Sequence, residues 1–178
     1  MPRDGFIVPD IMIEKFKFLL IYFFSWVIFF DLLRLVFLFY HFDKTRQLSF
    51  STIISSFWYG LRMDMSVAAY ILVPVGLFVW LSLFIHFFRR LVIYKIYTFI
   101  ILLLIALISF FDLEIYSQWG FRIDSTPLKF LATPKEAFAS VSHLPLFFLF
   151  IIFILCYALF YFCFKYMLRR IFFQQQNK

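Results

Sequence analysis

The sequence predicts an all-α membrane protein: a bundle of four transmembrane helices, with an amphipathic helix at the outer interface and short helices in the second outer loop. Of its 178 residues, 65% are hydrophobic and only 15% are charged, whereas soluble globular chains are about 45–50% apolar and about 25% charged. Four apolar runs are long enough to cross a hydrocarbon core about 30 Å thick as helices. None shows the two-residue alternation of a barrel strand. The composition excludes soluble globular and intrinsically disordered chains.

The predicted spans form a transmembrane domain over residues 16–168, between a cytoplasmic segment at 1–15 and a polar tail at 169–178. The spans cover residues 16–40, 66–88, 91–111 and 144–168. With the amino terminus inside, ten Lys and Arg side chains lie on the inner side and six on the outer side, so the positive-inside rule predicts that both ends are cytoplasmic. The net charge of +7 is then explained by the basic residues that orient the chain in the membrane. Because no basic stripe forms, no nucleic-acid partner is expected.

The first outer segment has the periodicity of an amphipathic helix over residues 50–61. Its apolar side chains recur at helical spacing and are separated by Ser and Thr. They are Phe50, Ile53, Ile54, Phe57, Trp58 and Leu61. Two interpretations remain open: a helix lying in the outer interface, where Trp and Tyr are favoured, or an ordinary helix packed on the bundle. Both place Arg62 and Asp64 at its carboxyl end.

The second outer segment, residues 112–143, carries two helix-start signals. Ser125-Thr126-Pro127 and Thr133-Pro134-Lys135-Glu136 each place a hydroxyl N-cap before a proline, and Thr133 with Glu136 makes a capping box. These signals predict two short helices, and Pro145 is expected to open the fourth span.

Charged side chains inside a span are costly, so each of them is a candidate for function. Asp31 and Arg34 lie three residues apart in the first span and can pair on one helix face. Either they form a structural pair that holds two helices together, or Arg34 contacts a lipid headgroup or phosphate.

Polar and aromatic side chains near the outer ends of the second and third spans form the predicted binding site. The set comprises Arg62, Asp64, Asp112, Glu114, Tyr116, Trp119, Arg122 and Asp124. If the helices bundle, this set is either a solvated salt-bridge network or a cradle for the phosphate of a lipid headgroup, in which carboxylates orient the arginines.

Searches for catalytic motifs predict no catalytic residue and no metal site. The sequence contains no phosphate-binding glycine loop, no Gly-x-Ser-x-Gly and no His-Glu-x-x-His. His41, His86 and His143 lie at different span edges. Cys156 and Cys163 lie about 10 Å apart along one predicted helix, too far to pair with each other.

Two runs resemble a known family. They are Gly60-Leu-Arg-Met-Asp-Met-Ser-Val-Ala-Ala-Tyr and, above all, the run from Asp112-Leu-Glu-Ile-Tyr-Ser-Gln-Trp-Gly-Phe-Arg-Ile-Asp to Ser140. Together they resemble the amino-terminal membrane region of bacterial sulfatase-like enzymes, the lipoteichoic acid synthase and phosphoglycerol transferase relatives in the alkaline phosphatase superfamily. The resemblance covers about residues 16–168.

The resemblance implies about five transmembrane helices followed by an extracytoplasmic α/β domain. In this family that domain holds manganese or zinc and a threonine nucleophile, and it moves phosphoglycerol or phosphoethanolamine from a membrane phospholipid to an envelope polymer or glycan. Nothing in this chain matches the nucleophile or the metal ligands, so no catalytic residue and no cofactor are expected in it.

Two hypotheses follow. In the first, the chain is the membrane-anchoring and lipid-docking part of such a transferase in the bacterial cytoplasmic membrane, truncated or separately encoded, with its catalytic domain elsewhere. In the second, it is a free-standing scaffold or interaction subunit without catalysis. The reading frame beyond Lys178 distinguishes them, because only the first expects a fifth span and a catalytic domain.

Overall fold

The computed structural model describes residues 7–120, 122 and 146–176, and every regular element in these ranges is a helix. Three helices are long and apolar enough to span a membrane. Their spans are Met12–Tyr40, Phe50–Leu81 and Leu91–Ser117. The all-helical prediction is therefore confirmed, together with three helices of membrane-spanning length and composition. The fourth span stays a prediction, because the helix there, α7 (Leu146–Gln176), contributes a shorter apolar stretch, Phe153–Tyr166.

The chain divides into two compact units. The first unit comprises Met1–Thr98 and Phe164–Lys178, and the second comprises Phe99–Cys163. Helix α4 (Leu91–Trp119) begins in the first unit and ends in the second. Helix α7 begins in the second unit and ends in the first.

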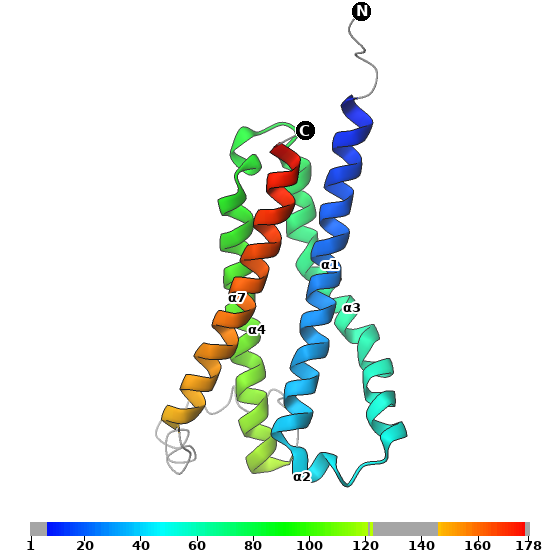
Figure 1. Cartoon of the computed structure of the whole chain (residues 1–178), viewed down its shortest axis with the longest axis vertical. Helices are drawn as coiled ribbons and strands as arrows, with labels where there is room; N and C mark the ends of the chain where they lie inside the picture. The colour runs from blue at the N-terminus through cyan, green and yellow to red at the C-terminus, as the bar shows by residue number, and fades with distance from the viewer. Residues whose placement is uncertain (1–6, 121, 123–145, 177–178) are drawn as a thin grey trace, which may run out of the picture. The chain divides into compact units, whose positions relative to one another are not determined.

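Helices α1 (Ile7–Tyr40) and α3 (Phe50–Leu81) form an antiparallel pair in the first unit. Lys15 on α1 donates to the Ser82 hydroxyl directly after α3 (3.0 Å), and Arg34 further along α1 pairs with Asp64 (2.6 Å). These contacts are 19 residues apart on α1 and 18 apart across α3, or about 28 Å and 27 Å at 1.5 Å per residue. The two helices therefore keep contact over that length. The amino-terminal turns of α3 then diverge from α1 (Figure 1).

A tight turn joins the pair through the short helix α2 (Phe42–Thr45). The Thr45 hydroxyl donates to the carbonyls of Leu38 (2.9 Å) and His41 (3.0 Å). Ser49 is the N-cap of α3, since its side-chain oxygen accepts a hydrogen bond from the Thr52 amide. The polar side chains of this segment therefore fix where α1 ends and α3 begins.

Helix α3 differs from the sequence prediction at both ends of the second span. The predicted amphipathic helix over 50–61 and the predicted span over 66–88 share one continuous helix, because the residues between them are mostly good helix formers without Pro or Gly. The helix ends at Leu81 rather than at residue 88. There the Ser82 hydroxyl donates to the Val79 carbonyl (2.6 Å), and a 3₁₀ helix, η1 (His86–Arg89), leads into α4.

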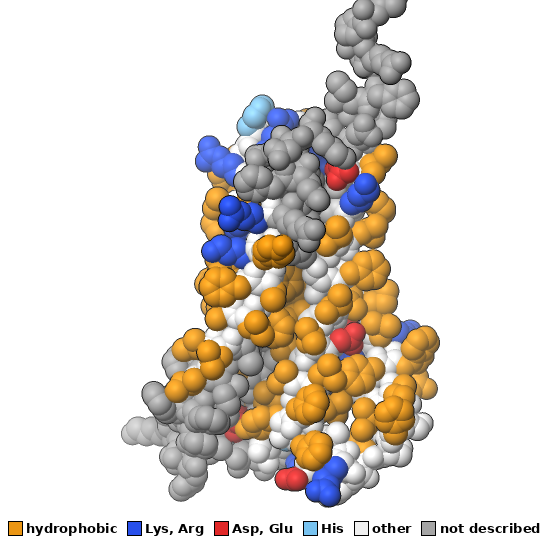
Figure 2. All heavy atoms as spheres, in the orientation of Figure 1, with side chains coloured by type: hydrophobic (Ala, Val, Ile, Leu, Met, Phe, Trp, Pro, Cys, Tyr) orange, Lys and Arg blue, Asp and Glu red, His pale blue; other side chains and the backbone are white. Residues whose placement is uncertain are grey.

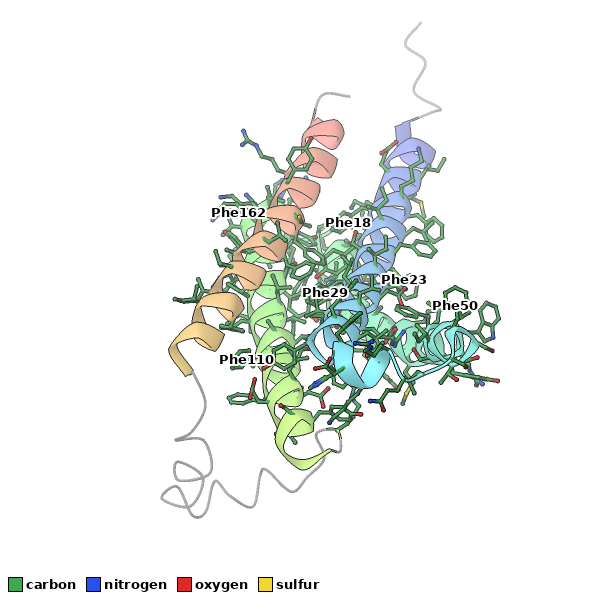
Figure 3. The ribbon with its side chains drawn as sticks, turned by 60° about the horizontal axis from the view of Figure 1, so that its bottom comes forward. Phe18, Phe23, Phe29, Phe50, Phe110 and Phe162 are labelled. Carbon is green, nitrogen blue, oxygen red and sulfur yellow. The ribbon has the colours of Figure 1, made fainter. Side chains whose placement is uncertain are left out.

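Aromatic side chains fill the core of the first unit. The Trp26 ring lies 4.8 Å from that of Phe164 and 5.5 Å from that of Phe29, and Tyr22 contacts Trp26 edge-on. The buried Tyr22 hydroxyl and the Thr98 hydroxyl share a hydrogen bond of 3.0 Å. Helix association in lipid relies on such van der Waals packing and interhelical hydrogen bonds, because lipid tails are as apolar as the side chains. Figure 3 shows Phe18 and Phe29 on α1, well separated from Phe50 at the start of α3.

In the second unit α4 packs against α7 through aromatic edges. Phe99 contacts the Tyr157 and Tyr161 rings at 5.7 Å each, and Phe110 contacts Phe153 at 5.5 Å. Helix α4 continues to Trp119, eight residues past the predicted end of the third span.

Helix α4 ends at Gly120. This residue has φ +74°, and its amide donates to the Tyr116 carbonyl (3.0 Å). This is the left-handed glycine that commonly follows a helix. Asp112, Glu114 and Tyr116 consequently lie on a helix rather than in a loop.

The outer boundaries of the first and last helices also differ from the prediction. Helix α1 begins at Ile7, inside the segment predicted to precede the first span, and α7 continues to Gln176, through most of the predicted polar tail. Hydropathy marks only the apolar stretch of a helix, whereas its backbone continues into polar turns. The two predicted short helices, Pro145 and Asp124 lie outside the described residues.

Candidate functional site

Arg34 is the centre of an ionic cluster between α1 and α3. Its Nη2 donates to Asp64 Oδ2 at 2.6 Å and its Nη1 to Asp31 Oδ1 at 3.2 Å. The guanidinium group also lies over the Phe57 ring, 5.5 Å from its centroid. The side chains of Arg34 and Asp64 are 17% and 13% exposed, against 35% for Asp31. Together with Gly60, these residues are called the Arg34 cluster below.

Helical spacing explains how the sequence assembles the cluster. Asp31 and Arg34 are three residues apart on α1, and Phe57, Gly60 and Asp64 follow one another at intervals of three and four on α3. A Cβ atom on Gly60 would lie 2.1 Å from Arg34 Nη2. A side chain at this position would therefore displace the guanidinium group from its place against α3.

The contacts of Arg34 indicate the role of the cluster. The predicted Asp31–Arg34 pair is present. The shorter of the two bonds that Arg34 makes, however, goes to Asp64 on α3. With both carboxylates ionised, these three side chains carry a formal charge of −1. Because two carboxylates and a ring surround the guanidinium group, the geometry favours a structural clamp between helices over a phosphate contact.

The cluster also marks a level along the α1–α3 pair. It lies about 28 Å from the level of Lys15 and Ser82 by helical rise, which is close to the roughly 30 Å thickness of a hydrocarbon core. Between the two levels α3 contains no charged residue from 65 to 81. The spacing of these two polar levels therefore fits the two boundaries of a bilayer core.

A second ionic pair lies in the second unit. Arg122 donates through both Nε and Nη2 to the same oxygen of Asp112, with an Nε–Oδ2 distance of 2.9 Å. The Asp112 side chain is 5% exposed, whereas that of Arg122 is 65% exposed. A buried carboxylate on α4 thus orients an exposed guanidinium group just beyond the end of the helix.

The remaining predicted residues have separate positions. Arg62 is exposed on α3, and a step of two residues turns it about 200° away from Asp64. Glu114 is buried and Tyr116 half-buried on α4, and Trp119 is the last residue of that helix. The structure thus brings Asp112 together with Arg122 in one unit and Asp64 together with Arg34 in the other.

Sequence reasoning missed Phe57 and Gly60 as parts of the site, and the pairing of Asp64 with Arg34. The stripe that contains them was visible in the sequence. Its members are Phe57, Gly60, Asp64, Ala68, Ile71 and Val75. This spacing of three and four is that of one helix face.

No group of three His, Cys, Asp or Glu side chains among the described residues is placed to hold a metal ion. Comparison of the chain with protein-family models, curated proteins and solved structures finds no match.

Proposed function

We propose that this chain is the membrane-anchoring and lipid-docking part of a sulfatase-like transferase that moves phosphoglycerol or phosphoethanolamine among cell-envelope lipids or glycans. The resemblance of the runs beginning at Gly60 and Asp112 supports the choice of family. Three helices of membrane-spanning length support the anchoring role. The observation that carries the docking role is the exposed Arg122 guanidinium group held by the buried Asp112 carboxylate.

The geometry of this pair suits recognition of a headgroup phosphate. A guanidinium group binds phosphate oxygens through parallel N–H bonds, and a fixed orientation lowers the entropy lost on binding. Asp112 provides that orientation from the last turns of α4, so it is a positioning residue and Arg122 the contact residue. Arg62, exposed at the level of the Arg34 cluster, is a second candidate contact.

Phosphoryl transfer itself is assigned to a separate catalytic domain. That domain would provide the manganese or zinc ion, the threonine nucleophile and the site for the polymer or glycan acceptor. No residue of this chain is given a part in those steps.

Lipid retention in nanodiscs tests the docking role, with native mass spectrometry as the readout. R122A should lower retention of phosphatidylglycerol but not of diacylglycerol, which lacks the phosphate. R46A removes an exposed arginine near α2. This control should change the retention of neither phosphatidylglycerol nor diacylglycerol.

D112N distinguishes an effect of net charge from an effect of Arg122 orientation, because the two change lipid binding in opposite directions. Removing a negative charge would strengthen binding of an anionic lipid if only net charge mattered, whereas loss of the Arg122 orientation weakens it. Stronger binding by D112N, or unchanged binding by R122A, would overturn the docking role and favour the scaffold subunit.

The proposal also places the chain in the bacterial cytoplasmic membrane with both ends inside. In a C156A/C163A background, Q47C should react with a membrane-impermeant thiol reagent added to intact cells. L83C should react only after permeabilisation. Labelling of L83C in intact cells, with Q47C labelled only after permeabilisation, would show that the orientation is the reverse of the one proposed.

A further inference from the structure

Two basic side chains converge on the residue that follows α3. Lys15 Nζ donates to the Ser82 hydroxyl at 3.0 Å, and Arg89 Nε donates to the Ser82 carbonyl at 2.9 Å. Arg90, the next residue in the chain, lies with its guanidinium group over the Phe87 ring. Lys15, Ser82, Arg89 and Arg90 are called the Ser82 site below. All four belong to the first unit.

Capping of α3 accounts for only part of this charge. The carboxyl end of a helix carries the equivalent of about −0.5 charge and has carbonyls without helical donors. Arg89 satisfies one of these carbonyls. The three basic side chains of the Ser82 site carry +3, however, and among the side chains that the structure describes no carboxylate forms an ion pair with them. The nearby Glu14 forms an ion pair with Lys17.

The spacing between the Ser82 site and the Arg34 cluster is close to the thickness of a hydrocarbon core, at whose boundaries lipid phosphates begin. The Ser82 site marks one of the two polar levels of the α1–α3 pair, about 28 Å from the Arg34 cluster. Lys and Arg side chains gather near the top of Figure 2, at the end where α1 begins. Basic groups between helix ends at this depth are a known arrangement for anionic headgroups.

We propose that the Ser82 site binds the phosphate of an anionic phospholipid headgroup, such as that of phosphatidylglycerol, in the adjacent leaflet. Lys15 offers an ammonium group with three donors, of which Ser82 takes one. Arg89 bonds Ser82 through Nε, and its Nη1 lies 3.4 Å from His86 Nε2, so Nη2 is the donor that it offers to a phosphate. An anion bound by both side chains would offset the repulsion between two cations held at one residue. This site is independent of Arg122 and of the proposed transferase role.

The test compares two double variants that each remove two positive charges. The full chain is reconstituted in phosphatidylcholine nanodiscs with a minor fraction of phosphatidylglycerol, and bound lipid is counted by native mass spectrometry. K15Q/R89Q should bind phosphatidylglycerol roughly 30-fold more weakly. K44Q/R46Q, with both charges near α2, should retain wild-type binding.

Further arms separate the alternatives. S82A keeps every charge but removes the hydroxyl that holds Lys15, so it should bind the lipid more weakly than wild type. K15R/R89K preserves charge and serves if the Gln variant does not fold; it should bind more weakly than wild type, because each exchanged side chain changes the donors that face Ser82. Excess inorganic phosphate should not displace the lipid.

Equal losses in the two double variants, or no loss in K15Q/R89Q, would overturn the site. Displacement by inorganic phosphate would show that the site takes a free anion instead of a lipid. Neither outcome bears on R122A and D112N, so failure of this site and failure of the headgroup dock remain distinguishable.

Discussion

The Arg34 cluster allows an ordered prediction for three substitutions. Asp64 accepts the shorter bond from Arg34 and is 13% exposed, whereas Asp31 accepts the longer one and is 35% exposed. Hydrogen bonds to charged groups contribute about 1.5–3 kcal/mol and exposed ion pairs about 0.2–1 kcal/mol. D64N should therefore lower the free energy of unfolding by about 2 kcal/mol, and D31N by about 0.5 kcal/mol. R34M should cost about 3 kcal/mol, because it leaves two facing carboxylates without the guanidinium group.

Reversible unfolding in mixed detergent micelles, followed by circular dichroism, measures these differences. D31N is the matched control for D64N, since both replace a carboxylate by an amide on the same arginine. Equal losses in D31N and D64N would refute the claim that Asp64 is the principal partner. Stabilisation by D64N would show that the surplus negative charge outweighs the bond, and the clamp interpretation would then be wrong.

Three further substitutions follow from single contacts. G60A should destabilise by about 2 kcal/mol in the same assay, because its Cβ displaces the Arg34 guanidinium group. G76A, whose Cβ meets nothing within 4 Å, should leave stability unchanged or raise it by about 0.5–1 kcal/mol; equal losses in the two variants would refute this reasoning. Y97F removes the hydroxyl that donates to an α3 carbonyl (2.9 Å) and should cost about 1 kcal/mol. G120A should cost about 1 kcal/mol, because φ there is +74°, and hydrogen exchange should accelerate in the last turn of α4.

The helical class was predictable because burial of the backbone in lipid permits few alternatives, and long apolar runs select helices. Helix boundaries were less predictable. Arg62 and Asp64 lower the hydropathy between residues 61 and 66, so the sequence predicted two helices where the structure has one. The backbone does not end at a charge, since Arg and Met are good helix formers and Asp64 finds a partner on α1. Hydropathy therefore located the apolar part of α3 but not its length.

The candidate site was predictable only where its partners are local. Asp31 and Arg34 are three residues apart, so helical spacing alone predicts that they can pair. The bond from Arg34 to Asp64 joins residues 30 apart in sequence and depends on the register of α1 against α3. Gly60 is the residue that sets how closely the guanidinium group approaches α3. Sequence patterns show that a buried charge needs a partner, but they do not show which helix provides it.

The signs of the ionic sites determine where phosphate recognition can occur. The charged side chains of the Arg34 cluster sum to −1, and two carboxylates already bind its guanidinium group. An anionic headgroup would be repelled there, so R34M should cost stability without changing lipid preference. The Ser82 site has the opposite sign, since its three basic side chains exceed the roughly half charge of the α3 carboxyl end. Arg122 differs from both, because the buried Asp112 carboxylate orients it while its side chain stays exposed. Loss of headgroup preference without loss of stability is therefore expected at Arg122, whereas variants of Lys15 and Arg89 should also lose the bonds that these side chains make to Ser82.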